Sequence, residues 1–547
     1  MSSLLQHLPI LPVVLPLLAG AAMLLIDDAH RTSRVVIALG SAFAQLAAAI
    51  ALLAVAAGAF PALWPDGVAV YLLGEWKAPF GIVLVADRLS AVMLALTAAL
   101  ALPSLVYGLA RWDRMGAHFH PLFQFLLMGL NGAFLTGDLF NLFVFFEVLL
   151  AASYGLLLHG SGARRVKAGL HYIAVNLAAS LVFLLGAALI YGVAGTLNMA
   201  DLAMRLPGLS AENRLLFDIG AALLGVVFLI KAGIWPLNFW LRDSYSAAGA
   251  PVSAIFSIMT KVGVYAVLRI ATLLPAQDMP APFDSGSLWL IGMATLTFGT
   301  IAMLNAHQPQ RLVACCIIVS SGILLTALGL GGAAIAGAAL FYLISSALAT
   351  GAFFMLGEMI ERSQPFGAGM LAVSLDYFGM DEAPDPNLPE DVVGVVIPAA
   401  LAFLGLGFIS CALLVTGLPP LSGFVAKFSL LAATLRSAPL DALPAGAWAL
   451  IAGVLGSGLI GIIALSRMGT RIFWNSGEWT VPRLRVIEAG PVVLLVGLCV
   501  LLAAGAGPVA DYLGATGQAL YTPQAYIDAV MAAGQQSVTQ ALAGAGR

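Results

Sequence analysis

Charged residues are scarce in this chain of 547 residues, where Asp, Glu, Lys and Arg together make up only 9%. Hydrophobic residues make up 61%, and the mean hydropathy is +1.00. Such a composition excludes a soluble fold and predicts a multi-span protein embedded in the lipid bilayer. The formal net charge of -3 also argues against a nucleic-acid partner, because the chain has no excess of positive charge to attract the phosphate groups.

Cysteine is also rare, with four residues in the chain: Cys315, Cys316, Cys411 and Cys499. All four lie in or beside apolar runs, and none belongs to a C-x-x-C pair. Disulfide frameworks and zinc sites depend on recurring cysteine spacings, so the sequence predicts neither. We expect the four thiols to be buried as small apolar groups, and we predict no metal site and no cofactor.

Long apolar runs, in contrast, fill the chain. A continuous helix needs about 20 apolar residues to cross a bilayer. Segmentation on that basis predicts fourteen spans, at residues 8–26, 35–58, 88–109, 119–136, 139–159, 168–193, 215–241, 250–273, 287–305, 311–330, 334–360, 394–436, 446–466 and 487–510. No Lys or Arg precedes the first apolar run, so we expect a retained span there instead of a signal peptide.

Two of these spans, 215–241 and 394–436, contain residues that interrupt a helix. The interrupting residues are Gly233 and Pro236 in the first and Pro419 and Pro420 in the second. Proline lacks a backbone N–H and leaves the carbonyl four residues earlier without its partner. Backbone polar groups without helical hydrogen-bond partners are tolerated at membrane depth only where protein or water surrounds them, so the two broken helices predict a transport site.

Among the ionisable residues inside otherwise apolar spans are Glu147, Lys231, Lys261 and Lys427. A charge at the centre of a bilayer helix costs about 2.5 to 3.5 kcal/mol, so it usually faces a partner or a water-filled path. Burial disfavours an ammonium group and a nearby carboxylate favours it, so a change in the Glu147 to Lys231 distance would make the lysine hold or release a proton. One such lysine could be a structural partner, but the set, with two members at helix breaks, indicates transport of ions or protons.

Three further polar residues are auxiliary candidates for the same path. Asp138 stands at the start of a predicted span, where a helix cap is the better interpretation. His159 and His171 flank a loop that contains Arg164, Arg165 and Lys167, so they fit interfacial positions better than relay positions.

Alternate loops differ in charge and length. One side carries fourteen Lys and Arg residues and the other six, so the basic side is expected to be cytoplasmic and both termini outside. Within residues 66–87, two short runs typical of β-strands, 70–76 and 81–86, flank Ala78 and Pro79, which predicts a short hairpin on the outer face. Residues 376–391 hold six acidic and no basic residues, which predicts a solvated cytoplasmic loop or a docking site for a basic partner subunit.

Several runs of the sequence resemble one known family. They are residues 136–147, 231–243, 250–253, 261–265 and 417–427. In them the chain is similar to the antiporter-like family, which includes large subunits of Mrp-type (also called Pha) monovalent cation/proton antiporters and proton-pumping membrane subunits of respiratory NADH:quinone oxidoreductase. Residues 71–76 and 191–198 look most like the D-type subunits of the Mrp antiporters.

The resemblance implies an all-α polytopic membrane protein of about fourteen transmembrane helices, with two five-helix units in inverted topology and one broken helix in each. The units would cover residues 119–273 and 287–466, the second with the acidic loop. Residues 1–110 would hold the first spans and the outer hairpin, and residues 487–547 the last span and a C-terminal tail. The tail after residue 511 is rich in small and polar residues, so we expect it to be only weakly helical.

The resemblance also implies roles for single residues. Glu147 would be the acid paired with Lys231, Lys261 the central relay lysine, and Lys427 the terminal ionisable group of the second unit. The chain departs from the family pattern at Asn238, Arg242 and Thr350, where many relatives have His, Pro and Lys. Thr350 is therefore only an auxiliary candidate, and water would have to bridge Lys261 to Lys427.

The function implied is that of a secondary transporter subunit and not of an enzyme. It would work with other Mrp subunits in a hetero-oligomer of the bacterial cytoplasmic membrane and exchange protons for sodium or another monovalent cation. The alternative is a pumping subunit of a redox enzyme, which neighbouring genes for flavin and iron-sulfur subunits would indicate. A stand-alone transporter is disfavoured, because neither broken helix carries polar groups suited to an organic substrate.

Overall fold

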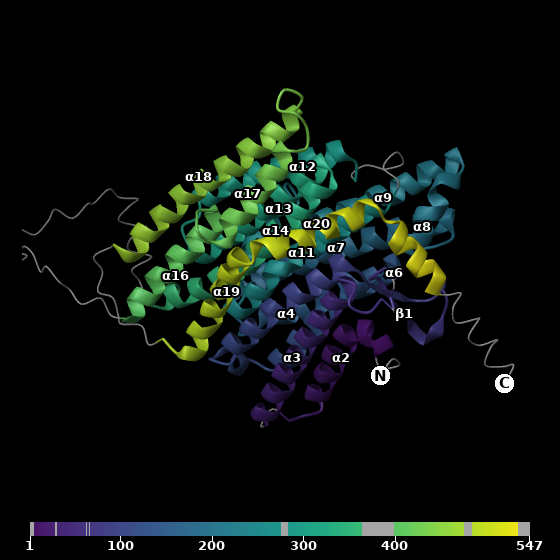
Figure 1. Cartoon of the computed structure of the whole chain (residues 1–547). Helices are drawn as coiled ribbons and strands as arrows, with labels where there is room; N and C mark the ends of the chain where they lie inside the picture. Colours follow the sequence, from purple (N-terminus) through teal and green to yellow (C-terminus); the bar gives the residue numbers. More distant parts are fainter. Residues whose placement is uncertain are drawn as a thin grey trace, which may run out of the picture.

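The computed structural model describes residues 5–27, 30–61, 63–64, 66–274, 283–363, 399–474 and 484–533. Nearly all of this part of the chain is helical (Figure 1). Twelve of its helices are long and apolar enough to cross a bilayer, and three shorter apolar helices accompany them. The all-α membrane fold is thereby confirmed, while the count of fourteen spans and the inverted repeat remain predictions. The acidic loop 376–391 lies outside the described residues.

The N-terminal part contains a three-helix group and a small sheet. Its elements are η1 (Leu8–Ile10), α2 (Leu11–Leu24), α3 (Arg31–Ala56), β1 (Ala69–Leu72), η2 (Leu73–Glu75), β2 (Val83–Ala86), α4 (Arg88–Gly108) and η3 (Trp112–Arg114). Strands β1 and β2 pair antiparallel, with Ala69 opposite Ala86 and Leu72 opposite Val83. The hairpin predicted at 66–87 is therefore confirmed.

The middle part begins with α5 and ends with the buried helix α11. Its elements are α5 (Phe119–Leu135), α6 (Leu139–Leu158), α7 (Ala163–Ala194), α8 (Met199–Arg205), η4 (Leu206–Gly208), α9 (Ala211–Ala232), α10 (Phe239–Ala247) and α11 (Ala250–Leu273). The span predicted at 215–241 is two helices in the structure, interrupted at residues 233–238 as the sequence indicated. Its second half extends farther than predicted, to Ala247.

The C-terminal part contains the second broken helix. Its elements are α12 (Ser285–Leu304), α13 (Pro309–Leu330), α14 (Ala333–Ser363), α16 (Ala399–Thr416), α17 (Ser422–Leu435), α18 (Ala445–Phe473), α19 (Val486–Ala504) and α20 (Ala506–Tyr521). The span predicted at 394–436 is interrupted between α16 and α17, where Pro419 and Pro420 stand.

The chain after residue 511 was expected to be a weakly helical tail, and this prediction is wrong. Helix α20 continues to Tyr521 and packs along α14 (Figure 1). The two helices approach closely because Gly337 and Gly517 have no side chain at the contact; a Cβ on Gly337 would lie 2.8 Å from the Leu513 carbonyl oxygen. Small residues that suggested a poor helix former instead form a packing surface.

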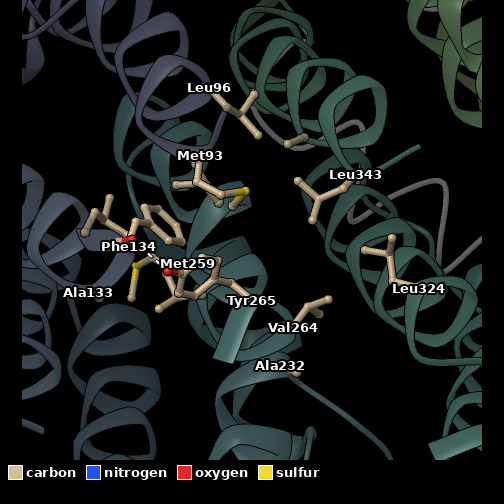
Figure 2. Close-up of a cluster of buried hydrophobic side chains, with 14 of the residues drawn as sticks. Met93, Leu96, Ala133, Phe134, Ala232, Met259, Val264, Tyr265, Leu324 and Leu343 are labelled. Atoms are coloured by element: carbon tan, nitrogen blue, oxygen red, sulfur yellow. Dashed lines mark hydrogen bonds between the residues drawn. The ribbon is translucent and has the colours of Figure 1, made fainter. Parts of the chain in front are cut away.

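Helices α11, α13 and α14 form the centre of the molecule (Figure 1). The apolar stretches of α11 and α13 are completely buried within the chain itself. An apolar cluster fills the space between them and the neighbouring helices, with Met93 and Leu96 from α4, Phe134 from α5, Tyr265 from α11 and Leu343 from α14 (Figure 2). The four cysteines are free and buried, as predicted.

The loops of the described chain gather at two opposite ends of the helices. At one end, here called the hairpin face, the His7 ring nitrogen lies 3.1 Å from the Tyr71 hydroxyl of the sheet, and the Arg269 guanidinium stacks on the Tyr526 ring. At the other end, here called the basic face, Arg165 bonds to the Ala247 carbonyl at 2.9 Å and Arg311 pairs with Asp243 at 3.5 Å. The first and last described residues thus lie at the same face.

Candidate functional site: four buried ionisable groups and two broken helices

Helix α9 ends one residue after Lys231. Gly233 follows it with φ of +71°, a conformation that favours glycine, and gives the chain its turn away from the helix. Pro236 stands between α9 and α10, and the backbone N–H of Trp235 is satisfied by the hydroxyl of Thr295 at 3.1 Å. The first break is therefore held against α12 by a side-chain hydrogen bond.

The Lys231 ammonium points to α7 and α6. It donates a hydrogen bond to the Asn176 side-chain oxygen at 2.9 Å and lies 5.4 Å from the centre of the Phe146 ring. On the facing helix α11, Gly263 lacks a side chain where the backbone at Lys231 approaches; a Cβ there would lie 2.8 Å from the Lys231 carbonyl carbon. Lys231 is thus fixed by close helix packing and by one neutral acceptor.

Glu147 lies on α6, one residue after Phe146, and is partly buried. Its carboxylate accepts a hydrogen bond from the hydroxyl of Ser180 on α7, one helical turn from Asn176. Among the described residues no direct ion pair joins Glu147 to Lys231. The two groups predicted to pair are instead connected through the Ser180 and Asn176 positions of one helix.

Lys261 is almost completely buried in the middle of α11. Its ammonium donates to the Ser320 hydroxyl of α13 at 2.8 Å, and that hydroxyl is 2.9 Å from the Ser346 hydroxyl of α14. Thr350, one turn farther along α14, donates to the Ser346 carbonyl at 2.8 Å. The central lysine is therefore connected to a row of hydroxyl groups that leads away from the first break.

A small cavity connects this row to Lys427. Its wall includes Ser320, Ser346, Thr350, Lys427 and Ser457, with further residues from α12, α13, α14 and α16. The cavity has room for about one water molecule. Lys427 lines this cavity directly, whereas Lys261 is connected to it through Ser320, and Thr350 also lies on its wall.

Lys427 lies on α17, after the second break, and reaches back to α16. Its ammonium donates to the carbonyl oxygens of Val415 at 3.1 Å and Thr416 at 2.7 Å. Gly417 follows with φ of +81°, and a Cβ there would lie 3.2 Å from the Lys427 Cε, so glycine leaves room for the lysine stem. The second lysine is bound to backbone carbonyls at a helix end.

The remaining candidates lie away from this row. Asp138 caps α6, since its carboxylate accepts from the Asn141 backbone N–H at 3.0 Å, and burial raises the pKa of this carboxyl above its ordinary value. His159 lies at the C-terminal end of α6 and is buried, with its ring nitrogen 2.7 Å from the Trp112 carbonyl, and its interfacial position remains a prediction. His171 is on the exposed side of α7.

Sequence reasoning overlooked Glu358. This carboxylate is buried near the basic face, where it accepts hydrogen bonds from the Trp112 indole at 2.9 Å and from the Ala250 backbone N–H at 3.2 Å. It therefore caps the N-terminus of α11, the helix that carries Lys261. The signal was present, because Glu358 lies inside the span predicted at 334–360 and met the criterion that selected Glu147. Ser180, Asn176, Ser320 and Ser346 were also overlooked, since uncharged polar residues are common in membrane helices.

Comparisons with known proteins agree with this arrangement. Residues 136–375 match the family model described as NADH:quinone oxidoreductase/Mrp antiporter, TM. A relative from Rhizobium meliloti (strain 1021), named as the D-type subunit of a probable K(+)/H(+) antiporter, is 50% identical over 97% of this chain and 99% of its own length. The D-type subunit of the Na(+)/H(+) antiporter of Alkalihalophilus pseudofirmus is 31% identical over 96% of this chain and 99% of its own length.

A chain in the solved structure of the Mrp complex from Dietzia sp. DQ12-45-1b is similar with a TM-score of 0.78 at 26% sequence identity. The match covers 96% of this chain and 99% of that chain. The protein therefore belongs to the NADH:quinone oxidoreductase/Mrp antiporter family, and within it to the D-type antiporter subunits. It is a transporter subunit and not an enzyme.

Proposed function

We propose that this chain is the proton-translocating subunit of a hetero-oligomeric antiporter that exchanges protons for a monovalent cation. One observation supports the proposal most: Lys231, Lys261 and Lys427 are each buried and each bonded to neutral oxygen atoms, and among the described residues none has a direct carboxylate partner. The names of the antiporter subunits from Rhizobium meliloti and Alkalihalophilus pseudofirmus support the same function.

Neutral acceptors suit proton exchange better than a salt bridge does. A carboxylate in direct contact would stabilise the ammonium strongly and oppose loss of its proton. An amide oxygen, a hydroxyl or a carbonyl stabilises the ammonium less, and a hydroxyl can also donate to the neutral amine. Lysine suits this role because its ammonium can be deprotonated in a buried site, unlike the guanidinium of arginine.

Glu147 would regulate the first lysine from one helix away. Its negative charge favours the ammonium form of Lys231, while Ser180 and Asn176 hold the two groups apart. A shift of α9 relative to α6 would change that separation and hence the charge of Lys231. The charge of Lys231 would in turn influence Lys261, giving a coupled series of titrations.

The hydroxyl row on α13 and α14 offers a connection from Lys261 to Lys427 despite threonine at position 350. The connection would run through Ser320 and Ser346 and then through water in the cavity. Hydroxyl groups and water both donate and accept, so they can carry a proton between lysines. The absent lysine of many relatives is replaced here by a hydrated step.

Access to Lys261 is expected from the basic face. On α11, Ser253, Ser257 and Thr260 lie between the basic face and Lys261. Beyond Lys261 the helix enters the apolar cluster of Figure 2, where the Tyr265 hydroxyl is bonded to the Phe134 carbonyl at 2.7 Å. A bidentate ion pair of Arg269 with Asp87, at 2.6 and 2.8 Å, closes the same helix at the hairpin face.

We place the basic face in the cytoplasm of a bacterial cell, with both termini outside, because basic loops are retained on the cytoplasmic side. Single cysteines at Ala163 and Lys77, both exposed, test this placement. The native cysteines are buried, so background labelling is low. Ala163→Cys should react with an impermeant reagent only after permeabilisation, and Lys77→Cys without it. Reaction of both from outside would contradict the orientation.

The transport proposal is tested by proton flux in everted vesicles that contain this chain with and without its partner subunits. A cation-dependent proton movement that requires the partners is expected, and sodium and potassium are compared directly because relatives carry both names. Flux that depends on a quinone reductant and not on a cation gradient would favour the alternative, a pumping subunit of a redox enzyme.

A further inference from the structure

The second helix break presents two carbonyl oxygens that the helix itself cannot pair. Val415 and Thr416 lie four residues before Pro419 and Pro420. An α-helix pairs a carbonyl with the N–H four residues later, and proline has no N–H. Consecutive prolines therefore free two neighbouring carbonyls, which also lie at the negative end of the α16 dipole.

The Lys427 ammonium occupies this position, with its nitrogen 3.1 Å from the Val415 oxygen and 2.7 Å from the Thr416 oxygen. The same oxygen pair is suited to an alkali cation, because carbonyls at unwound helix ends are common ligands for such ions in transporters. An ammonium group carries the same charge as potassium and is close to it in size. The lysine therefore occupies a site that a potassium-like ion can also fill.

The surroundings leave room for an ion. Gly458 of α18 faces the Thr416 carbonyl: a Cβ on it would lie 3.1 Å from the Thr416 oxygen and 3.9 Å from the Lys427 nitrogen. The adjoining cavity adds the hydroxyl of Ser457 and space for water. Two carbonyls, a hydroxyl and water give a set of neutral oxygen ligands of the kind found in potassium filters.

The charges around the site favour one monovalent ion at a time. In the described chain, the other titratable groups on the cavity wall are Cys316 of α13 and Tyr342 of α14. The described wall residues of α12, α16 and α18 include no titratable side chain. The titratable side chain that α17 adds to the described wall is Lys427 itself. Without a carboxylate, the site cannot compensate both an ammonium and a metal ion, so their occupancy is mutually exclusive.

We propose that the Val415 and Thr416 carbonyls form a binding site for a monovalent alkali cation of potassium size, which Lys427 vacates when it loses its proton. In the exchange, the Lys427 ammonium releases one proton to water and becomes a neutral amine, while one alkali cation takes its position at the two carbonyls. Charge is conserved in each exchange. This inference rests on the proposed antiport function, to which it adds the place where proton and cation compete.

Binding of radioactive rubidium to the purified full chain in lipid nanodiscs tests the site without transport. For the unmodified chain, we expect binding to strengthen as the pH rises, since protons compete through Lys427. Lys427→Met should bind rubidium with little dependence on pH, because no ammonium competes. Lys427→Arg should bind none at this site at any pH, because the guanidinium remains charged.

Glycine substitutions in α18 supply a matched pair that leaves the lysine in place. Gly458→Ala should weaken rubidium binding by about tenfold, since its methyl group narrows the space beside the Thr416 oxygen. Gly456→Ala, at a position with no atom within 4 Å of the added carbon, should leave binding unchanged. Equal binding in both glycine variants, together with unchanged pH dependence in Lys427→Met, would overturn the proposal.

The binding site and the transport function can fail separately. Lys231→Ala should abolish proton flux yet retain pH-dependent rubidium binding, because Lys231 belongs to the other break. Loss of rubidium binding in Lys231→Ala would contradict a local site at the α16 end. If the unmodified complex carries out antiport but rubidium does not compete with protons at Lys427, the proposed function stands and this site is rejected.

Discussion

Both helix breaks hold a buried lysine, but the lysine is bound differently at each. At the first break, a single proline lies between α9 and α10. Lys231 precedes the break and points away from it, to Asn176 of α7. At the second break, two prolines separate α16 and α17, and Lys427 follows the interruption and points back to the freed carbonyls. The first lysine is therefore coupled to a neighbouring helix and the second to its own broken backbone.

The difference extends to the nearby charge. Glu147 lies one residue from Phe146, whose ring contacts Lys231, and it bonds to Ser180 on the same helix as Asn176, the acceptor of Lys231. The described wall of the cavity at Lys427 contains no carboxylate. In the proposed mechanism, a negative charge makes the first lysine sensitive to a helix shift, whereas the second lysine responds to the cation that competes for its carbonyls. We infer that the first break sets proton affinity and the second exchanges the proton for another cation.

The largest effect is expected when either lysine is removed. If protons must pass both breaks in series, Lys231→Ala and Lys427→Ala should each reduce antiport to background, and the double variant should be no worse. Flux in everted vesicles measures this, with membrane insertion and partner assembly checked on the same preparation. Lys167→Ala, on the exposed side of α7, is the matched control and should transport normally.

Partial flux in each single variant, with silence only in the double variant, would show that the two breaks are parallel paths. Near-normal flux in Lys427→Ala alone would restrict the path to the first break. Either result would contradict the inference that the two breaks have different roles in one path.

Glu147 provides the next largest effect. Glu147→Gln keeps the shape of the side chain and its bond with Ser180 but removes the charge that favours the Lys231 ammonium, so antiport should be largely lost. Glu147→Asp should retain part of the flux, because the charge survives at shorter reach. Wild-type flux in Glu147→Gln would mean that the first break, like the second, works without a carboxylate.

A smaller effect is expected at Asn176, the acceptor of Lys231. Asn176→Leu leaves a buried ammonium without its hydrogen bond, which costs about 1.5 kcal/mol or more and corresponds to about a tenfold loss of flux. Asn176→Asp should behave differently, because a new direct ion pair would hold the proton on Lys231 and shift the pH dependence of flux to higher pH. Equal flux in both variants and wild type would exclude α7 from the coupling.

The smallest effect is expected between the two breaks, at the hydroxyl row. Ser320→Ala removes the acceptor of Lys261, but water in the adjoining cavity can take its place, so flux should fall only severalfold. Thr297→Ala on α12, whose exposed hydroxyl bonds its own helix, is the control. Complete loss of flux in Ser320→Ala, with normal assembly, would show that the serine itself carries the proton.

Much of the fold could be predicted from local patterns. The apolar runs gave most helix positions, and the prolines and glycines gave both breaks, because these depend on residues close together in the chain. The C-terminal prediction was wrong for a physical reason: α20 depends on close packing against Gly337 of α14, a contact that the local sequence does not contain.

The candidate site was predicted only in part. The charges at Glu147, Lys231, Lys261 and Lys427 are conspicuous because a charge in an apolar span is costly. The groups that bind them are uncharged, and nothing in the sequence distinguishes Ser320 or Asn176 from other polar residues of the helices. Glu358 could have been identified by the criterion used for Glu147, yet its role at the α11 N-terminus follows only from the packing of α14.

The sequence by itself determined that this protein lies in a membrane, that two of its helices are broken, and that four ionisable groups are buried among its spans. These properties follow from composition and from the missing N–H of proline, which act within one segment. Only the tertiary structure decided that Lys231 meets Asn176, that Lys261 is linked through Ser320 to the cavity at Lys427, and that Lys427 returns to the Val415 and Thr416 carbonyls. Those contacts join helices far apart in the chain, and their geometry is set by how closely the helices pack.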